Sequence, residues 1–559
     1  MRSFIYLIFL IGLIGCGQRP EPPLELVGPA TIYTADKIYT GTETTEDVHG
    51  LLIDEAGVIR AVFSEGKKPD IITPALSHMH FDGIIYPGFV DGHAHLAGIG
   101  VRELTLDLSG IGSIAALVAR IEAEVQRLEA GEVLIGRGWI ETDWPEARMP
   151  NAADIDPVSS DNPVLLTRAD GHALLANRAA MTAAGIMEAT PDPAGGQIER
   201  DAEGAATGLM IDNAMGLFSG LTESPSEADL GKALETGARL YASRGWTGVH
   251  NMSVSLPEAP IMQALSRNGN LPQRVYNAYD VDGFNIAAGQ KFETDTVLNR
   301  SVKIYMDGAL GSRGALLFQP YSDRPETKGL ALRGKAETMA LFEEALTEDV
   351  QMAVHAIGDK ANSDAIDWIG EAMVRAEQSD IPAYTDHRWR IEHAQILRTQ
   401  DIPRLARLGI IASMQPSHAI GDLKFAPDRL GSDRLDGAYA WKTVLNQGGL
   451  IVGGSDAPVE FGSPLIEFYA AIARKTLEGT SGKDWSPEEV VSREEALAMF
   501  TKAPAFASFQ EDVLGTLEVG KLADITVFDR DIMVIPEAEI LDAKPLATLI
   551  AGKIVWQAE

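Results

Sequence analysis

Short apolar runs alternate with longer amphipathic stretches through the middle of the chain. The runs include GFVDG, TGVHNM, SVKIYMDG, MAVHAIG, RIEHAQI, GIIASMQ and LIVGGSD, and residues 113–130 and 336–349 have the periodicity of helices. Strands that alternate with helices predict a parallel sheet, and this many units favour a (β/α)8 TIM barrel over residues 88–504. A doubly wound open sheet is the alternative, but the Gly-rich loop that this fold often uses is missing.

The two ends of the chain have a different, β-rich pattern. GLLIDEAGVIRAVF, at residues 50–63, reads as two short strands joined by a turn, and residues 516–531 and 547–557 look alike. We therefore expect residues 28–87 and 505–559 to form one small β-sandwich. Residues from about 130 to 230 contain further strand-like segments and a Gly-rich hairpin sequence, GGQIERDAEGAATG, which predict an insertion over the top of the barrel.

The charge of the chain limits its partners. Its 559 residues carry a formal net charge of −33, which disfavours binding to nucleic acid. A hydrophobic content of 45% is ample for a large core. We expect a small-molecule substrate as the partner, and self-association into a homo-oligomer is left open.

The first residues read as a targeting segment, MRSFIYLIFLIGLIGC. The apolar run of residues 4–14 follows a positive residue and is too short to span a bilayer, which needs about 20 residues, so it is typical of a secretory signal peptide. The end, LIGC, resembles a bacterial lipobox, and Cys16 is the single cysteine of the chain. We expect residues 1–16 to be a lipoprotein leader, lipidation at Cys16, and residues 17–27 to be a tether. An ordinary signal peptide that contains a cysteine is the alternative.

This leader predicts the location of the protein. A lipidated Cys16 would anchor the chain to the bacterial cell envelope, on the periplasmic side or at the cell surface. The membrane would then be contacted through the lipid alone.

Two His-x-His pairs lie close together in LSHMHFDGIIYPGFVDGHAH. Alternation along a strand places both rings of a pair on one face, where they can share a metal ion. His93 and His95 end an apolar run, and the carboxyl ends of barrel strands carry the functional groups. His78 and His80 precede FDGIIYPG and belong to the terminal β-rich region, so we expect their rings in water.

Later apolar runs supply the additional ligands that a metal site needs. They are Lys303 in SVKIYMDG, His355 in MAVHAIGD, His393 in RIEHAQ and Asp456 in LIVGGSDAP. At about 30 residues per βα unit, the spacing assigns the His93/His95 pair to strand 1, and it assigns Lys303, His355, His393 and Asp456 to strands 4, 5, 6 and 8. Neutral imidazoles and carboxylates are suitable ligands for zinc and similar divalent ions.

Five other residues are weaker candidates for a substrate pocket, and each has a structural alternative. Asp170 and His172 could serve the insertion itself, Arg390 could be a buried ion-pair partner, and Trp139 could be core. His418 follows the predicted seventh strand and could lie near a substrate. The five are Trp139, Asp170, His172, Arg390 and His418.

Nine stretches together resemble the amidohydrolase superfamily, and more closely the subgroup that contains N-substituted formamide deformylases. They are PGFVDGHAH, GRGW, VLLTRADGHALLAN, VKIYMDGALGSRGA, VHAIGDKA, RIEHAQ, ASMQPSHA, GGSDAPV and GTLEVGKLADITVFDRD. The resemblance covers almost the whole chain from about residue 28. It implies one or two divalent ions, expected to be Zn²⁺, with ligation or water activation by His93, His95, His355, His393 and Asp456. It further implies that Lys303 is either carboxylated, as a bridge between two ions, or unmodified beside one.

The function implied is hydrolysis of a non-peptide carbon–nitrogen bond, in an amide or a formamide. Asp456 would act as the catalytic base and then as an acid. Related barrels instead cleave esters or cyclic amides, or deaminate rings. A lipoprotein that binds a ligand on an inactive barrel is the alternative outside enzyme chemistry.

Overall fold

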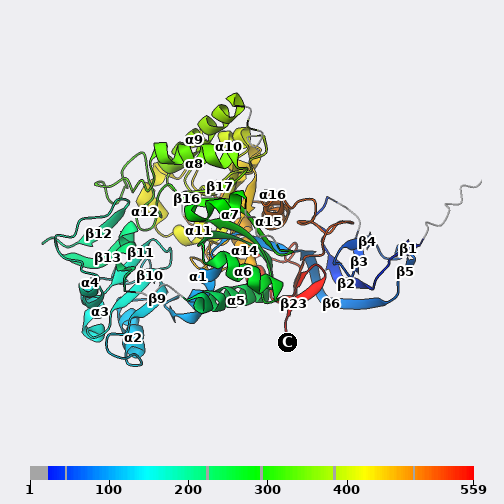
Figure 1. Cartoon of the computed structure of the whole chain (residues 1–559), viewed down its shortest axis with the longest axis horizontal. Helices are drawn as coiled ribbons and strands as arrows, with labels where there is room; N and C mark the ends of the chain where they lie inside the picture. The colour runs from blue at the N-terminus through cyan, green and yellow to red at the C-terminus, as the bar shows by residue number, and fades with distance from the viewer. Residues whose placement is uncertain are drawn as a thin grey trace, which may run out of the picture.

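The computed structural model describes residues 23–43, 47–221, 226–289, 294–379, 381, 385–482 and 485–559. Its centre is an eight-stranded parallel sheet in which each strand pairs with the next along the chain (Figure 1). The strands are β7 (Phe89–Ala94), β14 (Trp246–Val254), β15 (Arg274–Tyr279), β16 (Val297–Tyr305), β17 (Gln351–Ala356), β18 (Arg390–His393), β19 (Ile411–Met414) and β20 (Ile451–Gly453). Because the order follows the chain without reversal, the doubly wound alternative is excluded.

The first and last strands, β7 and β20, nearly close this sheet into a barrel. At their carboxyl ends, the Asp456 N–H donates to the His93 carbonyl oxygen at 2.6 Å, and the His95 N–H donates to the Ala457 carbonyl oxygen at 2.8 Å. The predicted parallel α/β barrel is therefore confirmed as a nearly closed eight-stranded sheet. The residues expected on strands 1, 4, 5, 6 and 8 lie on or directly after β7, β16, β17, β18 and β20.

Helices surround the barrel and bury their apolar faces on it (Figure 1). α5 shows how the sequence sets such boundaries: Ser226 and Asp229 form a capping box at its start, and Gly245 ends it at a φ of 99°, which glycine tolerates. The helices are α1 (Leu96–Leu104), α5 (Glu227–Arg244), α6 (Glu258–Arg267), α7 (Phe284–Ala288), α8 (Lys335–Thr347), α9 (Asp359–Gln378), α10 (Ile402–Leu408), α11 (Pro416–Asp422), α12 (Ala426–Leu430), α13 (Trp441–Asn446), α14 (Pro464–Ala473), α15 (Arg493–Phe500) and α16 (Lys502–Ala507). Short 3-10 turns are η2 (Val281–Gly283), η4 (Ser432–Arg434), η5 (Pro487–Glu489) and η6 (Glu537–Asp542).

Strands from both chain ends form a second sheet of seven strands, in the order β23-β22-β21-β6-β2-β3-β4. They are β2 (Ala30–Ile38), β3 (Val48–Asp54), β4 (Ile59–Phe63), β6 (Leu76–Pro87), β21 (Ile525–Phe528), β22 (Pro545–Ile550) and β23 (Lys553–Gln557). A separate pair, β1 (Leu24–Glu25) and β5 (Ile71–Ile72), adds two short parallel strands.

The predicted β-sandwich is not confirmed in this region. The long strand β6 pairs in parallel with β2 and antiparallel with β21, so strands from both ends extend one sheet instead of stacking as two. On the exposed part of β6, His78 and His80 point into water while Phe81 is buried, as the alternation predicts.

A third sheet of six strands lies between the first and second barrel strands in sequence and covers one end of the molecule (Figure 1). Its strands are β8 (Leu106–Asp107), β9 (Leu134–Trp139), β10 (Val164–Arg168), β11 (Ala173–Ala176), β12 (Gly196–Arg200) and β13 (Ala206–Asp212), with α2 (Ile114–Val125), α3 (Ala152–Ser159), α4 (Arg178–Ala183) and η1 (Asn213–Phe218). β12 and β13 form the hairpin that the Gly-rich sequence predicts. The sheet of this insertion starts with β8, before residue 130. A two-residue strand has no readable pattern, so this earlier start could not be predicted from the sequence.

The predicted leader, residues 1–16, and the beginning of the tether lie outside the described residues, and Cys16 lies there with them. Across the described ranges, no helix combines the length and apolarity needed to cross a membrane.

Candidate metal centre and pocket

Three predicted site residues meet at the carboxyl end of the barrel. His93 on β7, His393 on β18 and Asp456 after β20 place one ligand atom each within 4.8 Å of one another, and all three side chains are buried. In the described part of the chain, this is the one group of three or more such residues that meets that spacing. Because the residues come from strands 1, 6 and 8, closure of the barrel is what brings them together.

Two members of this cluster have unusual backbone conformations. His393 has a φ of 74° and Asp456 a φ of 59°, in the left-handed region that non-glycine residues rarely occupy. Such conformations cost about 1–3 kcal/mol each and concentrate at functional sites. Both of these residues belong to the cluster.

Hydrogen bonds to the Nδ1 atoms fix the orientation of three imidazoles. The Nδ1–H of His93 donates to Glu392 Oε2 at 2.5 Å, that of His95 to the Met252 carbonyl oxygen at 3.0 Å, and that of His393 to Gln415 Oε1 at 2.9 Å. Each ring is thus left with its Nε2 lone pair. His93 Nε2 and His95 Nε2 lie 3.4 Å and 3.1 Å from Asp456 Oδ1. Lone pairs that face a carboxylate oxygen at these distances suit a cation held between them.

A buried ion pair supports His93 from behind. Glu392 is fully buried and accepts from Arg390 Nε at 2.7 Å and from a terminal Arg390 nitrogen at 3.0 Å. Although burial raises the pKa of Glu392, Arg390 and His93 outweigh it and hold that pKa well below its usual range. Burial and the nearby Lys303 lower the pKa of His93 to about 4, so the imidazole is neutral at physiological pH, as a metal ligand must be.

His355 and Lys303 lie beside the cluster of His93, His393 and Asp456. The His355 ring lies 4.5 Å from the His393 ring, and its Nε2 has no hydrogen-bond partner among the described residues. Burial lowers the pKa of both His355 and His393 well below the usual value. Lys303 Nζ lies 3.4 Å from His93 Nε2, and burial lowers its pKa as well. Both residues therefore adjoin the three-residue cluster.

Asp456 is the residue around which the cluster is organised. Burial would raise its pKa, but His93, His95 and His393 outweigh that effect and keep it ionised. Its Oδ1 faces His93 and His95, whereas its Oδ2 faces His418 Nε2 at 3.7 Å. One oxygen is therefore directed at the imidazole cluster and the other at an adjoining cavity.

The insertion contributes a group of paired polar residues above this end of the barrel. Arg168 bonds Asp170 at 2.5 Å and Glu141 at 2.8 Å. The Nδ1–H of His172 donates to Asp212 Oδ1 at 2.6 Å, and the His172 ring lies 5.4 Å from the His355 ring. The insertion thus forms part of the wall over the candidate metal centre.

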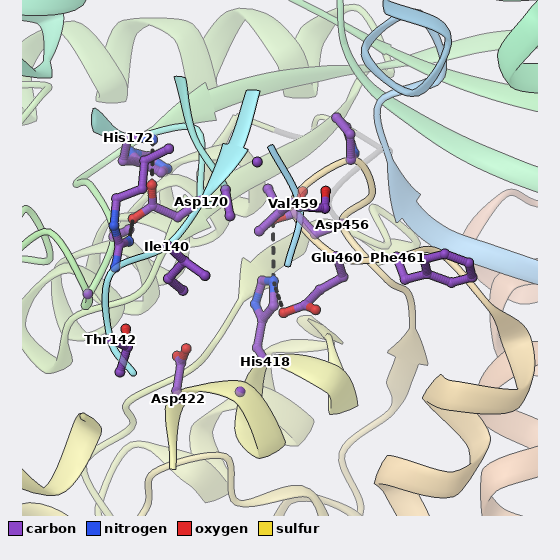
Figure 2. Close-up of a pocket in the computed structure, with 18 of the residues that line it drawn as sticks. Ile140, Thr142, Asp170, His172, His418, Asp422, Asp456, Val459, Glu460 and Phe461 are labelled. Carbon is purple, nitrogen blue, oxygen red and sulfur yellow. Dashed lines mark hydrogen bonds and ion pairs between the residues drawn. The ribbon is translucent and has the colours of Figure 1, made fainter. Parts of the chain in front are cut away.

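Two cavities meet at the centre. One, of about 520 Å³, extends over α11 and the loop after β20 (Figure 2). The other, of about 630 Å³, extends over β14 and β16 and is lined by His95, Lys303 and His355. His172, His393 and Asp456 line both, so a substrate in either cavity could reach the cluster.

The weaker pocket candidates have different placements. Asp170, His172 and His418 line the first cavity. Arg390 is fully buried and serves Glu392, with further bonds to His250 Nδ1 and the Gly92 carbonyl oxygen. Trp139 is fully buried in the core of the insertion, where its indole N–H donates to the Leu166 carbonyl oxygen at 2.9 Å. Neither Trp139 nor Arg390 lines the two cavities.

Four residues with roles in this geometry were not singled out from the sequence. Glu392 could have been found, because strand alternation places it on the same face as Arg390 in RIEH. Gln415, Glu460 and Asp212 give no such signal, since each lies far in sequence from the histidine that it contacts or faces.

The donor set fits a divalent metal ion. It combines neutral imidazoles, whose tautomers are fixed by acceptors behind them, with an ionised carboxylate, a combination that suits zinc and related ions. With the nearly closed barrel, these features define the class of a metal-dependent hydrolase with its centre at the carboxyl ends of the strands.

The amidohydrolase family profile matches residues 82–556, and the chain belongs to this family. It is 33% identical over 531 residues to YtcJ of Bacillus subtilis (strain 168), an inferred amidohydrolase, covering 93% of this chain and 98% of that protein. It is 28% identical to the N-substituted formamide deformylase of Arthrobacter pascens, over 85% of this chain and 88% of that enzyme. The resemblance read from the sequence is thereby confirmed.

A solved structure supports the same fold. An uncharacterized metal-dependent hydrolase from Pyrococcus horikoshii OT3 superimposes with a TM-score of 0.71 at 25% identity, covering 91% of this chain and 99% of that chain.

Proposed function

We propose that this amidohydrolase uses a bound divalent ion to hydrolyse a non-peptide carbon–nitrogen bond, in an amide or a formamide. The observation that carries the proposal is the orientation of the imidazoles: the Nδ1–H groups of His93, His95 and His393 are engaged, and the Nε2 atoms of His93 and His95 face Asp456 Oδ1. The similarity to an N-substituted formamide deformylase supports this choice of bond.

His93, His95, His393 and Asp456 would hold the ion, with His355 beside them. When bound, a divalent ion polarises a carbonyl oxygen and lowers the pKa of a water molecule to about 7. Zinc is the ion that the donor set favours, as a single ion or as a pair bridged by a carboxylated Lys303.

Asp456 would move the proton of the reaction. Its pKa is held low, so the carboxylate is available to accept a proton from the attacking water at physiological pH. Oδ2 faces the cavity and is the atom placed to receive that proton and return it to the leaving nitrogen. His172, oriented by Asp212, lies on the opposite wall and would orient the substrate.

The test is hydrolysis by the zinc-loaded protein of a panel that holds N-alkylformamides, N-alkylacetamides, a simple ester, a lactam and an aminated heteroaromatic ring. We expect amine release from the formamides or acetamides in wild type and none from His393→Ala. The matched control is His80→Ala, an exposed histidine on β6. Turnover of the ester, lactam or ring alone would contradict the carbon–nitrogen assignment, and bound metal without any turnover would favour a ligand-binding protein.

We further propose that the enzyme is a lipoprotein of the bacterial cell envelope. The support is in the sequence, where a short apolar segment leads to LIGC and the single cysteine, Cys16. A lipid at that position would keep the barrel at a membrane surface, on the far side of the Pro-containing tether.

A further inference from the structure

The cavity beside the candidate metal centre contains a carboxylate that has no close partner. Glu460 follows β20 and its side chain is 30% exposed, into this cavity. In the described part of the chain its carboxylate makes no hydrogen bond, and the His418 imidazole faces it at 3.9 Å. Burial, together with Asp422 and Asp456, raises the pKa of Glu460 to about 7. The ionised form of this side chain therefore lacks a compensating positive charge.

His418 provides a second sign that a ligand belongs here. Its residue is 9% exposed, and its Nε2 makes no hydrogen bond with any described residue. This one nitrogen lies 3.7 Å from Asp456 Oδ2 and 3.9 Å from Glu460 Oε1, too far for a hydrogen bond to either (Figure 2). A single imidazole cannot satisfy both carboxylates, and Asp422 lies on the same wall.

The cations around this cavity are already engaged. Arg168 pairs with Asp170 and Glu141, and Lys424 pairs with Asp143 at the rim. The remaining two direct their guanidinium groups at backbone carbonyl oxygens: Arg102 bonds that of Glu460, and Arg244 bonds that of Phe461. None of the four is directed at the Glu460 carboxylate, which leaves it able to pair with a positively charged group of a ligand.

We propose, building on the amide hydrolysis proposed above, that this cavity is a subsite for a substrate whose amide is linked by an apolar chain to an ammonium group. Glu460 is the residue that sets this specificity. The apolar lining suits the chain between the two ends, and it includes Ile140, Leu310, Phe425 and Phe461. A charge-assisted contact between an ammonium and a carboxylate is about twice as strong as a neutral hydrogen bond.

The geometry also sets the length of the chain. Because the same His418 nitrogen lies 3.7 Å from Asp456 Oδ2 and 3.9 Å from Glu460 Oε1, these two carboxylate oxygens are at most about 7.6 Å apart. An ammonium that reaches Glu460 from a scissile bond beside Asp456 would be separated from it by roughly three to five carbon atoms, at about 1.5 Å per bond. Mono-N-acylated diamines meet this description.

The test measures binding without turnover, so that it does not depend on hydrolysis. Two sulfonamides that lack a cleavable carbonyl are compared, N-(4-aminobutyl)methanesulfonamide and its isosteric neutral counterpart N-pentylmethanesulfonamide. Binding of each to the zinc-loaded protein is measured by calorimetry for wild type, Glu460→Gln and Asp422→Asn. Glu348→Gln, an exposed carboxylate after α8, is the matched control.

We expect wild type and Glu348→Gln to bind the ammonium compound at least about tenfold more tightly than the neutral one, and Glu460→Gln to lose that preference. Equal binding of both compounds by wild type, or no binding of the ammonium compound, would overturn the proposal. A preference that survives in Glu460→Gln but disappears in Asp422→Asn would overturn the assignment to Glu460. If no amide of the panel is cleaved but the preference for the ammonium compound remains, the proposed amide hydrolysis is contradicted and the proposed ammonium subsite is not.

Discussion

Replacing Glu392 by glutamine should weaken metal binding although Glu392 is not expected to touch the ion. The carboxylate accepts three hydrogen bonds: Oε1 from Arg390 Nε at 2.7 Å, and Oε2 from His93 Nδ1 at 2.5 Å and from Arg390 at 3.0 Å. Glutamine keeps one oxygen and presents an NH₂ group at the other position. In either orientation this NH₂ group faces another donor, from Arg390 or from His93. In the orientation where it faces His93 Nδ1–H, the His93 ring would turn or its tautomer would reverse.

The size of the effect follows from these contacts. Breaking a buried ion pair by removing one charge costs about 3–5 kcal/mol of stability, because Arg390 is left buried and uncompensated. Loss of the partner that orients a metal-binding histidine lowers metal affinity about 10–100-fold, which corresponds to about 1.4–2.8 kcal/mol. Glu392→Gln should therefore lose both stability and zinc affinity.

The assay is competition for Zn²⁺ with a chromogenic chelator, together with denaturant unfolding of the metal-free protein. Glu467→Gln is the matched control: Glu467 is also fully buried, on α14, and accepts the Ser417 N–H at 3.0 Å. Burial raises the pKa of Glu467 well above its usual value, which favours the neutral acid, and glutamine should change stability by about 1 kcal/mol or less. If Glu392→Gln kept the zinc affinity and unfolding midpoint of wild type, this reasoning would be refuted.

Three further substitutions test the site and the anchor. His93→Ala should abolish metal binding and activity, whereas His80→Ala, at an exposed histidine, should change stability by only about 0.5 kcal/mol and leave the metal content intact. The metal content is measured by mass spectrometry, and an equal loss in both variants would contradict the assignment of His93 as a ligand. Burial lowers the pKa of Lys303 and favours the neutral amine, which can react with carbon dioxide to give a bridging carbamate. Lys303→Ala should therefore lose activity and regain part of it when a short carboxylic acid takes the place of the carbamate. Full metal content and activity without any acid would exclude a bridging role. Cys16→Ser should move the protein from the membrane fraction to the soluble fraction on immunoblots, and a soluble wild type would contradict lipidation.

The barrel could be predicted from the sequence because its strands are buried on both faces and read as continuous apolar runs. The same runs end at His93, His355, His393 and Asp456, so the positions of the strand ends are enough to indicate the candidate ligands. The single terminal sheet could not be predicted in this way. It depends on the pairing of β6 with β2 and β21, and local alternation does not specify partners that are distant in sequence.

The surroundings of the site were less predictable than its centre. Trp139 stands in GRGWIETD, which shows no regular alternation, yet its indole lies in a core that exists because the insertion forms its own sheet. Glu460 comes from the loop after β20 and His418 from α11, and their proximity depends on how the loop and the helix pack. Side chains that meet through tertiary packing leave no periodic signal in the sequence.

The central claim is that the imidazole and carboxylate cluster binds a metal ion that is required for amide hydrolysis. The most direct measurement is titration of the metal-free protein with Zn²⁺ while amine release from an N-alkylformamide or N-alkylacetamide is recorded. We expect no release at the start, a rise in proportion to bound zinc, and a plateau at one or two equivalents. Amine release by the metal-free protein, or zinc bound to saturation at the cluster with none of these amides cleaved, would contradict the account.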